Sequence, residues 1–222
     1  MDLTRFARAL AADTSSLRFL MGVVVSIQSN YTVTVTIAGS TSQISAVKYA
    51  SSVCPRVGSS VYMVTDGSDL WIISQLAPVG SPSPTALRGT NQTLTTAVET
   101  AISFSSVVND GWGSFNLAGN PTRLTAVLPG RYMVTGFVQF ASNATGTREI
   151  AARVNGTTKY GVDTSLAASG APTHLSVTTP AFTMAATDYV ELTAYQNSGG
   201  NLDIVTLTEA PALSLIYLGT AG

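Results

Sequence analysis

The chain has 222 residues, enough for one large or two small domains, because single cores usually close at about 100 to 200 residues. Charged residues make up only 10% of it and the formal net charge is −1, so it lacks the positive surface that binding a phosphate backbone requires. The longest apolar run, residues 19–27, is far shorter than the roughly 20 residues that span a bilayer. Its first residues do not read as a signal peptide. We therefore expect no nucleic-acid partner, no membrane span and synthesis in a cytoplasm.

Residues 1–21 are predicted to be a short helical segment. Apolar residues recur there at steps of three and four, interrupted by Asp13, at Leu3, Phe6, Leu10, Leu17 and Leu20. Asp13, Thr14 and Ser15 are favourable N-cap residues, so the helix is expected to stop near Ala12 and restart. Three arrangements stay open: packing on the following domain, a free coiled coil, or contact with another protein.

Residues 22–77 are predicted to form a small closed barrel. The apolar period changes to two at Gly22, with Val23, Val25 and Ile27 in one run and Val33, Val35 and Ile37 in the next. Three further strand patterns follow, at 44–49, 60–65 and 70–76. Five short strands within about 55 residues favour a closed barrel.

Three stretches of this barrel resemble the OB-type barrels of phage tail and baseplate proteins. They are Gly-Val-Val-Val-Ser at 22–26, Cys-Pro-Arg-Val-Gly-Ser-Ser-Val at 54–61 and Leu-Trp-Ile-Ile-Ser-Gln-Leu at 70–76. Ser59 stands where those barrels often carry Asp. The resemblance implies a domain that docks on other virion proteins, through residues 1–77.

Residues 78–91 are predicted to be a semi-rigid linker, because proline, glycine and serine dominate them and no strand alternation is visible. Residues 92–222 again consist of strand patterns. Turn signals separate them at 109–111, 118–121, 129–130, 142–146, 155–156, 168–172 and 197–201. Seven turns in about 130 residues predict a β-sandwich.

The second domain resembles the TNF/C1q jelly-roll superfamily over residues 92–219. The resemblance is carried by Phe104, by Asn-Asp-Gly-Trp at 109–112, and by the stretches 124–132, 154–156, 184–192 and 213–218. Leu124, Val127 and Thr187 depart from the family pattern. The fold class is thus predicted as all-β: a short N-terminal helix, an OB-like barrel and a TNF/C1q-like jelly roll. The resemblance also implies a homotrimer.

A three-fold ring can bury one apolar sheet face per subunit without leaving a free edge. Aromatic side chains suit such a face, and the candidates are Tyr132, Phe137, Tyr195 and Tyr217. Each of the four could equally lie in the core of its own domain. No particular residue can be assigned to receptor binding.

No catalytic, cofactor or metal site is predicted. His174 and Cys54 are single residues of their type, too few for a zinc site, and His174 lies in a turn pattern. Four carboxylates, Asp110, Asp163, Asp188 and Asp203, also fall in turn patterns, where Asp caps backbone groups. We therefore expect no enzymatic activity.

The order of modules predicts a structural virion protein, assembled in the cytoplasm of a host bacterium. In this hypothesis the barrel anchors a trimeric minor tail or tail-tip protein, and the jelly roll binds a host-surface glycan or protein. The alternative is a capsid decoration or head-fibre protein. A secreted cytokine-like ligand is disfavoured because no export signal is recognised.

Overall fold

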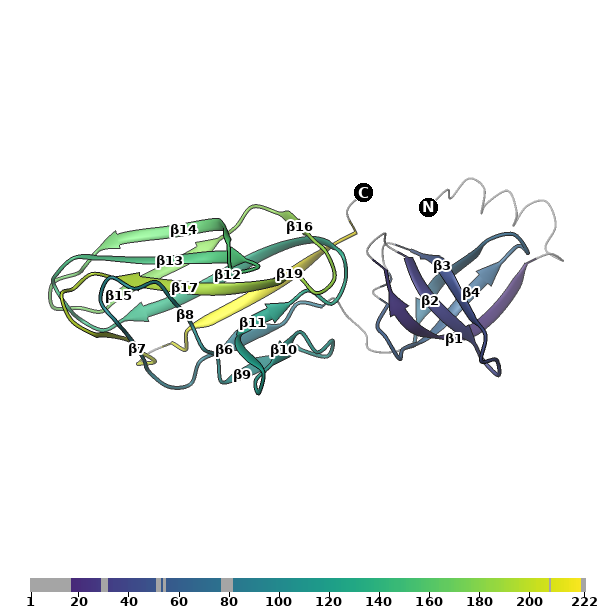
Figure 1. Ribbon diagram of the computed structural model, residues 1–222, viewed down its shortest axis with the longest axis horizontal. Helices are drawn as coiled ribbons and strands as arrows, with labels where there is room; N and C mark the ends of the chain where they lie inside the picture. The colour runs from purple at the N-terminus through teal and green to yellow at the C-terminus, as the bar shows by residue number, and fades with distance from the viewer. Residues whose placement is uncertain are drawn as a thin grey trace. The chain divides into compact units, whose positions relative to one another are not determined.

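The computed structural model describes residues 17–28, 32–50, 53, 55–76, 82–207 and 209–220. These residues form strands, turns and loops and include no helix, which confirms the all-β prediction for this part of the chain. None of its segments is an apolar helix long enough to cross a bilayer. The chain divides near residue 82 into two compact units, a barrel and a sandwich (Figure 1). Most of the predicted N-terminal helix, and Cys54, lie outside the described residues.

The first unit is a closed five-stranded barrel with the strand order β1-β2-β3-β5-β4. Strands β3 and β5 pair in parallel and all other pairs are antiparallel. The strands are β1 (Arg18–Ile27), β2 (Thr32–Ile37), β3 (Gln43–Tyr49), β4 (Ser60–Thr65) and β5 (Leu70–Gln75). The barrel and the positions of its strands, apart from the start of β1, agree with the prediction from the period-two pattern.

Strand β1 begins at Arg18, so the last four residues of the expected helical segment are strand instead. Phe19 pairs with Val64 and Leu20 pairs with Met63. Residues 19–21 are all apolar, because one side of β1 faces the core and the other side also carries apolar groups. Such an unbroken run hides the alternation that would have marked it as strand.

The barrel core consists of inward-facing aliphatic residues from all five strands. Each is almost completely buried: Val24, Val33, Val35, Val47, Val61, Met63 and Ile72. Burying a side chain of this size contributes about 1.5–3 kcal/mol relative to leaving it in water, so this cluster is the main source of the barrel's stability.

A close approach inside the barrel requires glycine at position 22. A Cβ atom added to Gly22 would meet the backbone oxygen of Thr36 and the end of the Met63 side chain. Because the backbone of β2 cannot move aside easily, we expect Gly22→Ala to destabilise the barrel by about 1–3 kcal/mol. Denaturant unfolding followed by Trp71 fluorescence measures this loss. Thr41→Ala, at an exposed position of the same barrel, is the control; equal effects of the two substitutions would contradict the packing.

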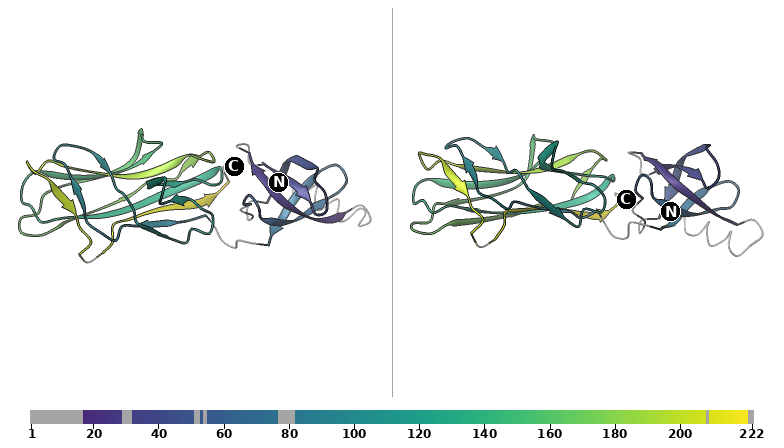
Figure 2. Two further views of the ribbon diagram at one scale, coloured as in Figure 1. Left: turned by 60° about the horizontal axis from the view of Figure 1, so that its bottom comes forward. Right: turned by 90° about the horizontal axis from the view of Figure 1, so that it is seen from below.

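The second unit is a sandwich of two antiparallel sheets (Figure 2). The first, called the β13 sheet, has the order β10-β11-β17-β13-β14, with β8 also paired to β17. Its strands are β8 (Thr100–Ala101), β10 (Phe115–Asn116), β11 (Asn120–Thr125), β13 (Thr147–Val154), β14 (Thr158–Leu166) and β17 (Tyr189–Gln196).

The second sheet, called the β12 sheet, has the order β7-β18-β12-β19-β6-β9, and β15 and β16 also pair with β12. Its strands are β6 (Thr85–Leu87), β7 (Gln92–Leu94), β9 (Ser106–Val108), β12 (Gly130–Phe140), β15 (Thr173–Thr178), β16 (Phe182–Met184), β18 (Leu202–Ile204) and β19 (Ala212–Gly219). A two-sheet sandwich in the second half of the chain is therefore confirmed.

The sandwich starts earlier than predicted, inside the expected linker at 78–91. Strand β6 lies in that range and pairs with both β19 and β9. The prolines that suggested a linker precede the strand, where a missing N–H costs no ladder hydrogen bond. Pro84 even joins the sheet, since its carbonyl accepts a hydrogen bond of 3.1 Å from the Leu215 backbone N–H.

Candidate subunit interface and loop end

The outer face of the β13 sheet carries most of the ion pairs found among the described residues of the sandwich; we call it the charged face. Arg153 Nε lies 2.9 Å from Glu99 Oε1, and Lys159 Nζ lies 2.7 Å from Glu149 Oε1. Lys159 also approaches Glu99 at 3.5 Å. Along the same sheet, Arg123 Nε donates to Glu191 at 3.1 Å, and its guanidinium stacks 3.9 Å above the Tyr189 ring.

The charged groups of this face shift the pKa values of Glu99 and Lys159. Burial alone would raise the pKa of Glu99, but hydrogen bonds from Thr193 and Arg153 and the charges of Lys159 and Arg153 outweigh it, so the pKa is lowered. The hydrogen bond to Glu149, opposed by burial and assisted by the charge of Glu99, raises the pKa of Lys159. A sheet face with this many paired charges is typical of a surface that is exposed to solvent.

The lowered pKa of Glu99 predicts a pH-dependent contribution to stability. Its ionised form is favoured in the folded state, so the contribution is present at neutral pH and disappears as the pH falls through the folded-state pKa. We expect Glu99→Gln to cost up to about 1 kcal/mol at pH 7 and less at pH 3, where more of the carboxylate is protonated. Urea unfolding at both pH values measures this difference. The exposed Glu209 supplies the control: a Glu209→Gln variant showing the same pH dependence would contradict the assignment.

The outer face of the β12 sheet has a different character; we call it the uncharged face. Near the centre of the sheet, strand alternation points apolar or hydroxyl-bearing side chains outward from β12, β19, β15 and β6, and toward the end of β12 the paired Gln139 and His174 follow on the same side. The central side chains are Thr85, Leu87, Met133, Thr135, Phe137, Ser176, Thr178, Ser214 and Ile216. Among the described outward positions of this sheet, charge occurs only at Arg131 and at Asp203, near the two ends of β12.

A shallow hollow of about 210 Å³ lies on the uncharged face, beside Phe137 and between β12, β15 and β19. At the margins, Val108 and Leu218 are about half exposed, at 45% and 49%. An uncharged, partly apolar sheet face with a hollow suits contact with another protein surface better than contact with water.

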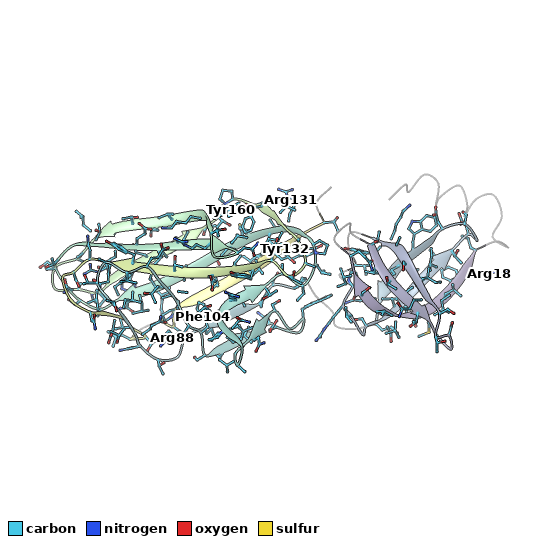
Figure 3. The ribbon with its side chains drawn as sticks, in the orientation of Figure 1. Arg18, Arg88, Phe104, Arg131, Tyr132 and Tyr160 are labelled. Carbon is cyan, nitrogen blue, oxygen red and sulfur yellow. The ribbon has the colours of Figure 1, made fainter. Side chains whose placement is uncertain are left out.

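The four aromatic residues predicted for a subunit interface do not share one face. Tyr132 and Tyr217 are buried between the two sheets, with ring centroids 5.1 Å apart, and cannot offer interface area. Figure 3 shows Tyr132 within the body of the sandwich and Arg131 at its periphery. Phe137 lies on the uncharged face, whereas Tyr195 lies on the outer side of the opposite sheet. The single-face prediction is therefore wrong.

The cause of that error is the period of a strand. Tyr132 and Phe137 are five residues apart on β12, and an odd spacing places two side chains on opposite faces. Met133, Leu87 and Ile216 were missed as candidates, although the first shares the parity of Phe137 on the same strand. The run of uncharged alternate positions along 133–137 was the available signal.

Three loops gather at one end of the sandwich, which we call the loop end: 141–146, 167–172 and 197–201. Hydrogen bonds tie them together, from the Ala167 N–H to the Gly146 carbonyl at 2.9 Å and from the Thr147 N–H to Asn197 Oδ1 at 2.6 Å. The chain enters the sandwich at Ser83, whose hydroxyl accepts a hydrogen bond of 3.2 Å from the Tyr217 N–H in the second half of β19, so the loop end lies at the opposite end of the sheets.

The four carboxylates that fall in turn patterns of the sequence each accept hydrogen bonds at separate places in the structure. Asp110 accepts hydrogen bonds from the Ser114 and Phe115 N–H groups, at 2.6 and 3.0 Å. Asp163 and Asp188 also accept from backbone N–H groups, and Asp203 accepts from the Thr93 hydroxyl. His174 lies on the outer side of β15, its ring 6.0 Å from that of Phe137. Within the described ranges, no three His, Cys, Asp or Glu side chains cluster as a metal site would.

Comparison with known proteins found neither a matching family model nor a matching curated protein. Among solved structures the chain is similar to the Eiger TNF of S. frugiperda, with a TM-score of 0.46 and 12% sequence identity. That match covers 64% of this chain and 96% of the other. The strand order within the two units makes the described part of the chain an all-β protein with a barrel and a sandwich.

Proposed function

We propose that this chain is a non-enzymatic structural protein of a bacteriophage particle, in which a homotrimer of TNF/C1q-like jelly rolls presents its loop end to the host surface. The observation that carries the trimer is the contrast between the two outer faces of the sandwich. The charged face has its ions paired in place, whereas the uncharged face carries Phe137, Met133 and Ile216 at its centre and its formal charges, Arg131 and Asp203, near the ends of β12. Burying the centre of that face therefore desolvates no Arg, Lys, Asp or Glu side chain.

The barrel is the proposed docking module. Its closed order, with β3 and β5 parallel, supports the OB-like type, which the sequence resemblance ties to phage tail and baseplate proteins. Its outer surface carries a row of exposed apolar side chains on β1 and β4, including Phe19, which is 72% exposed, and the paired Met21 and Tyr62. Exposed apolar rows of this kind mark protein contacts, here with a neighbouring virion protein.

The tail placement is tested on phage particles. Particles carrying only residues 1–81 should keep the barrel docked and lose adsorption to host cells, because the loop end is removed. Phe19→Asp in the full chain should instead reduce incorporation into particles. Full adsorption by the truncated particles would overturn the proposal.

Antibody labelling of intact particles, viewed by electron microscopy, tests the position directly. Label on the tail or its tip is the expected result. Label on the head would contradict the tail placement and favour the capsid decoration or head-fibre alternative, for which the same trimer would cover three-fold positions of the shell.

A further inference from the structure

Two buried polar side chains interrupt the apolar interior of the β13 sheet at its loop end. The inward positions of β13 and β17 are apolar along most of their length, as at Ile150 and Leu192. At the loop end the next inward positions are Arg148 and Gln196, which face each other in the strand register and are both 0% exposed. Burying an arginine and a glutamine is costly unless their polar atoms are bonded, so their partners define what they do.

Arg148 bonds almost entirely to the loop at 141–146. Its Nη1 donates to the carbonyls of Thr145 and Thr147, at 3.0 Å each. Its Nη2 lies 3.3 Å from both the carbonyl and the Oδ1 of Asn143. Among the described residues no carboxylate pairs with it, and burial lowers the pKa of Arg148. Backbone and amide oxygens, rather than a counter-ion, therefore hold the two terminal nitrogens of this buried cation and tie the loop to it, while its buried Nε has no hydrogen-bond partner among the described residues.

Gln196 holds the neighbouring loop at 197–201 in the same way. Its Nε2 donates to the carbonyls of Leu94 and Gly200, at 3.2 and 2.9 Å. Its Oε1 accepts from the Ser198 N–H and hydroxyl, at 2.8 and 2.7 Å. Both the oxygen and the nitrogen of the Gln196 side chain are thus hydrogen-bonded. These bonds hold the backbone of the loop 197–201 in place from the interior of the sandwich.

The three loops above these two residues carry no charged side chain. The loops 141–146, 167–172 and 197–201 contain only Ala, Ser, Thr, Asn, Gly and Pro, and Ser142, Thr145, Ser169, Asn197 and Asn201 are exposed. Amide and hydroxyl groups donate and accept hydrogen bonds at once, which matches a ligand built of hydroxyl groups. Because the loops carry no ionised side chain, they provide no positive charge to compensate an anionic ligand for the water that it loses on binding.

We propose that the loop end is a preformed binding surface for a neutral carbohydrate, and that Arg148 and Gln196 are its positioning residues, fixing the loops without touching the ligand. The inference rests on the proposed function of the loop end as the host-contact surface and names the ligand class and the residues that shape it. Loops fixed before binding lose little conformational entropy on contact, which raises affinity for a weakly bound ligand.

The experiment measures binding of the purified full chain to an array of immobilised neutral and acidic oligosaccharides, with heparin as a polyanion probe. Hydrogen exchange of the loops is followed in parallel. The wild type should bind neutral members and not heparin. Arg148→Met should weaken that binding at least tenfold and speed exchange in 141–146, while Arg148→Lys should restore part of both. Arg153→Met, which removes a charge from the outer face of the same strand, should change neither.

Three results would overturn the inference: binding only to acidic members or heparin, no binding to any neutral member, or wild-type affinity in Arg148→Met. If Arg148→Met does not fold, Gln196→Met gives the same test, because it removes the side-chain hydrogen bonds to Gly200 and Ser198 and leaves Arg148 in place. Failure of the phage proposal is seen separately, by particle labelling. If the chain binds neutral glycans but is absent from phage particles, the proposed virion role is wrong and the proposed binding surface stands.

Discussion

Replacing Arg148 with methionine is expected to destabilise the sandwich by about 3 kcal/mol, the largest single-residue loss predicted for this unit. The substitution keeps much of the apolar stem but removes the donor of the part-buried hydrogen bonds to the carbonyls of Asn143 and Thr145. A hydrogen bond from a charged donor contributes about 1.5–3 kcal/mol, and the bonds to both residues are lost together. Equilibrium unfolding in guanidinium, followed by Trp112 fluorescence, measures the change.

Arg153→Met is the matched control, because Arg153 lies on the same strand but faces outward and pairs with Glu99 at the surface. Surface ion pairs contribute at most about 1 kcal/mol. If the two variants lose equal stability, the distinction between the buried and the outward arginine is unfounded, and so is the role given to Arg148.

Phe137→Asp is expected to dissociate the proposed trimer. The residue lies near the middle of the uncharged face, so assembly would bury a carboxylate from each subunit without a partner. Several kcal/mol are lost for each such buried ion. Because every 1.4 kcal/mol changes a dissociation constant tenfold, we expect association to weaken by more than about a hundredfold. Sedimentation at micromolar concentration should then show a single 23.0 kDa species.

The opposite sheet provides the comparison for this variant. Val162 lies on the outer side of β14, is 50% exposed and neighbours the charged face. Val162→Asp therefore introduces the same group on an outer sheet face, away from the proposed interface, and should leave the assembly intact. Loss of assembly in both variants, or in neither, would contradict the choice of face.

The barrel was predictable from the sequence because its signal is local. In strands such as β2, Val33, Val35 and Ile37 alternate with threonine, and period two in short runs separated by turns leaves few alternatives. The start of β1 was missed because residues 19–21 are apolar on both sides of the strand, so no alternation of apolar and polar residues marks it.

The face of each aromatic residue depends on where a strand begins, which sequence periodicity fixes only within a residue or two. Tyr217 was assigned to an interface on its residue type, although Leu213 and Leu215, at even spacing before it, point into the core. The polar pair of the loop end was out of reach from sequence. Arg148 and Gln196 are 48 positions apart, and only the strand register shows that they face each other.

The mass of the purified full chain in solution tests the trimer most directly. Light scattering across a concentration series at micromolar concentrations should give about three times the 23.0 kDa chain mass. A constant mass of 23.0 kDa over that range would mean that the uncharged face stays in water in a stable single subunit, and the proposed assembly would be wrong.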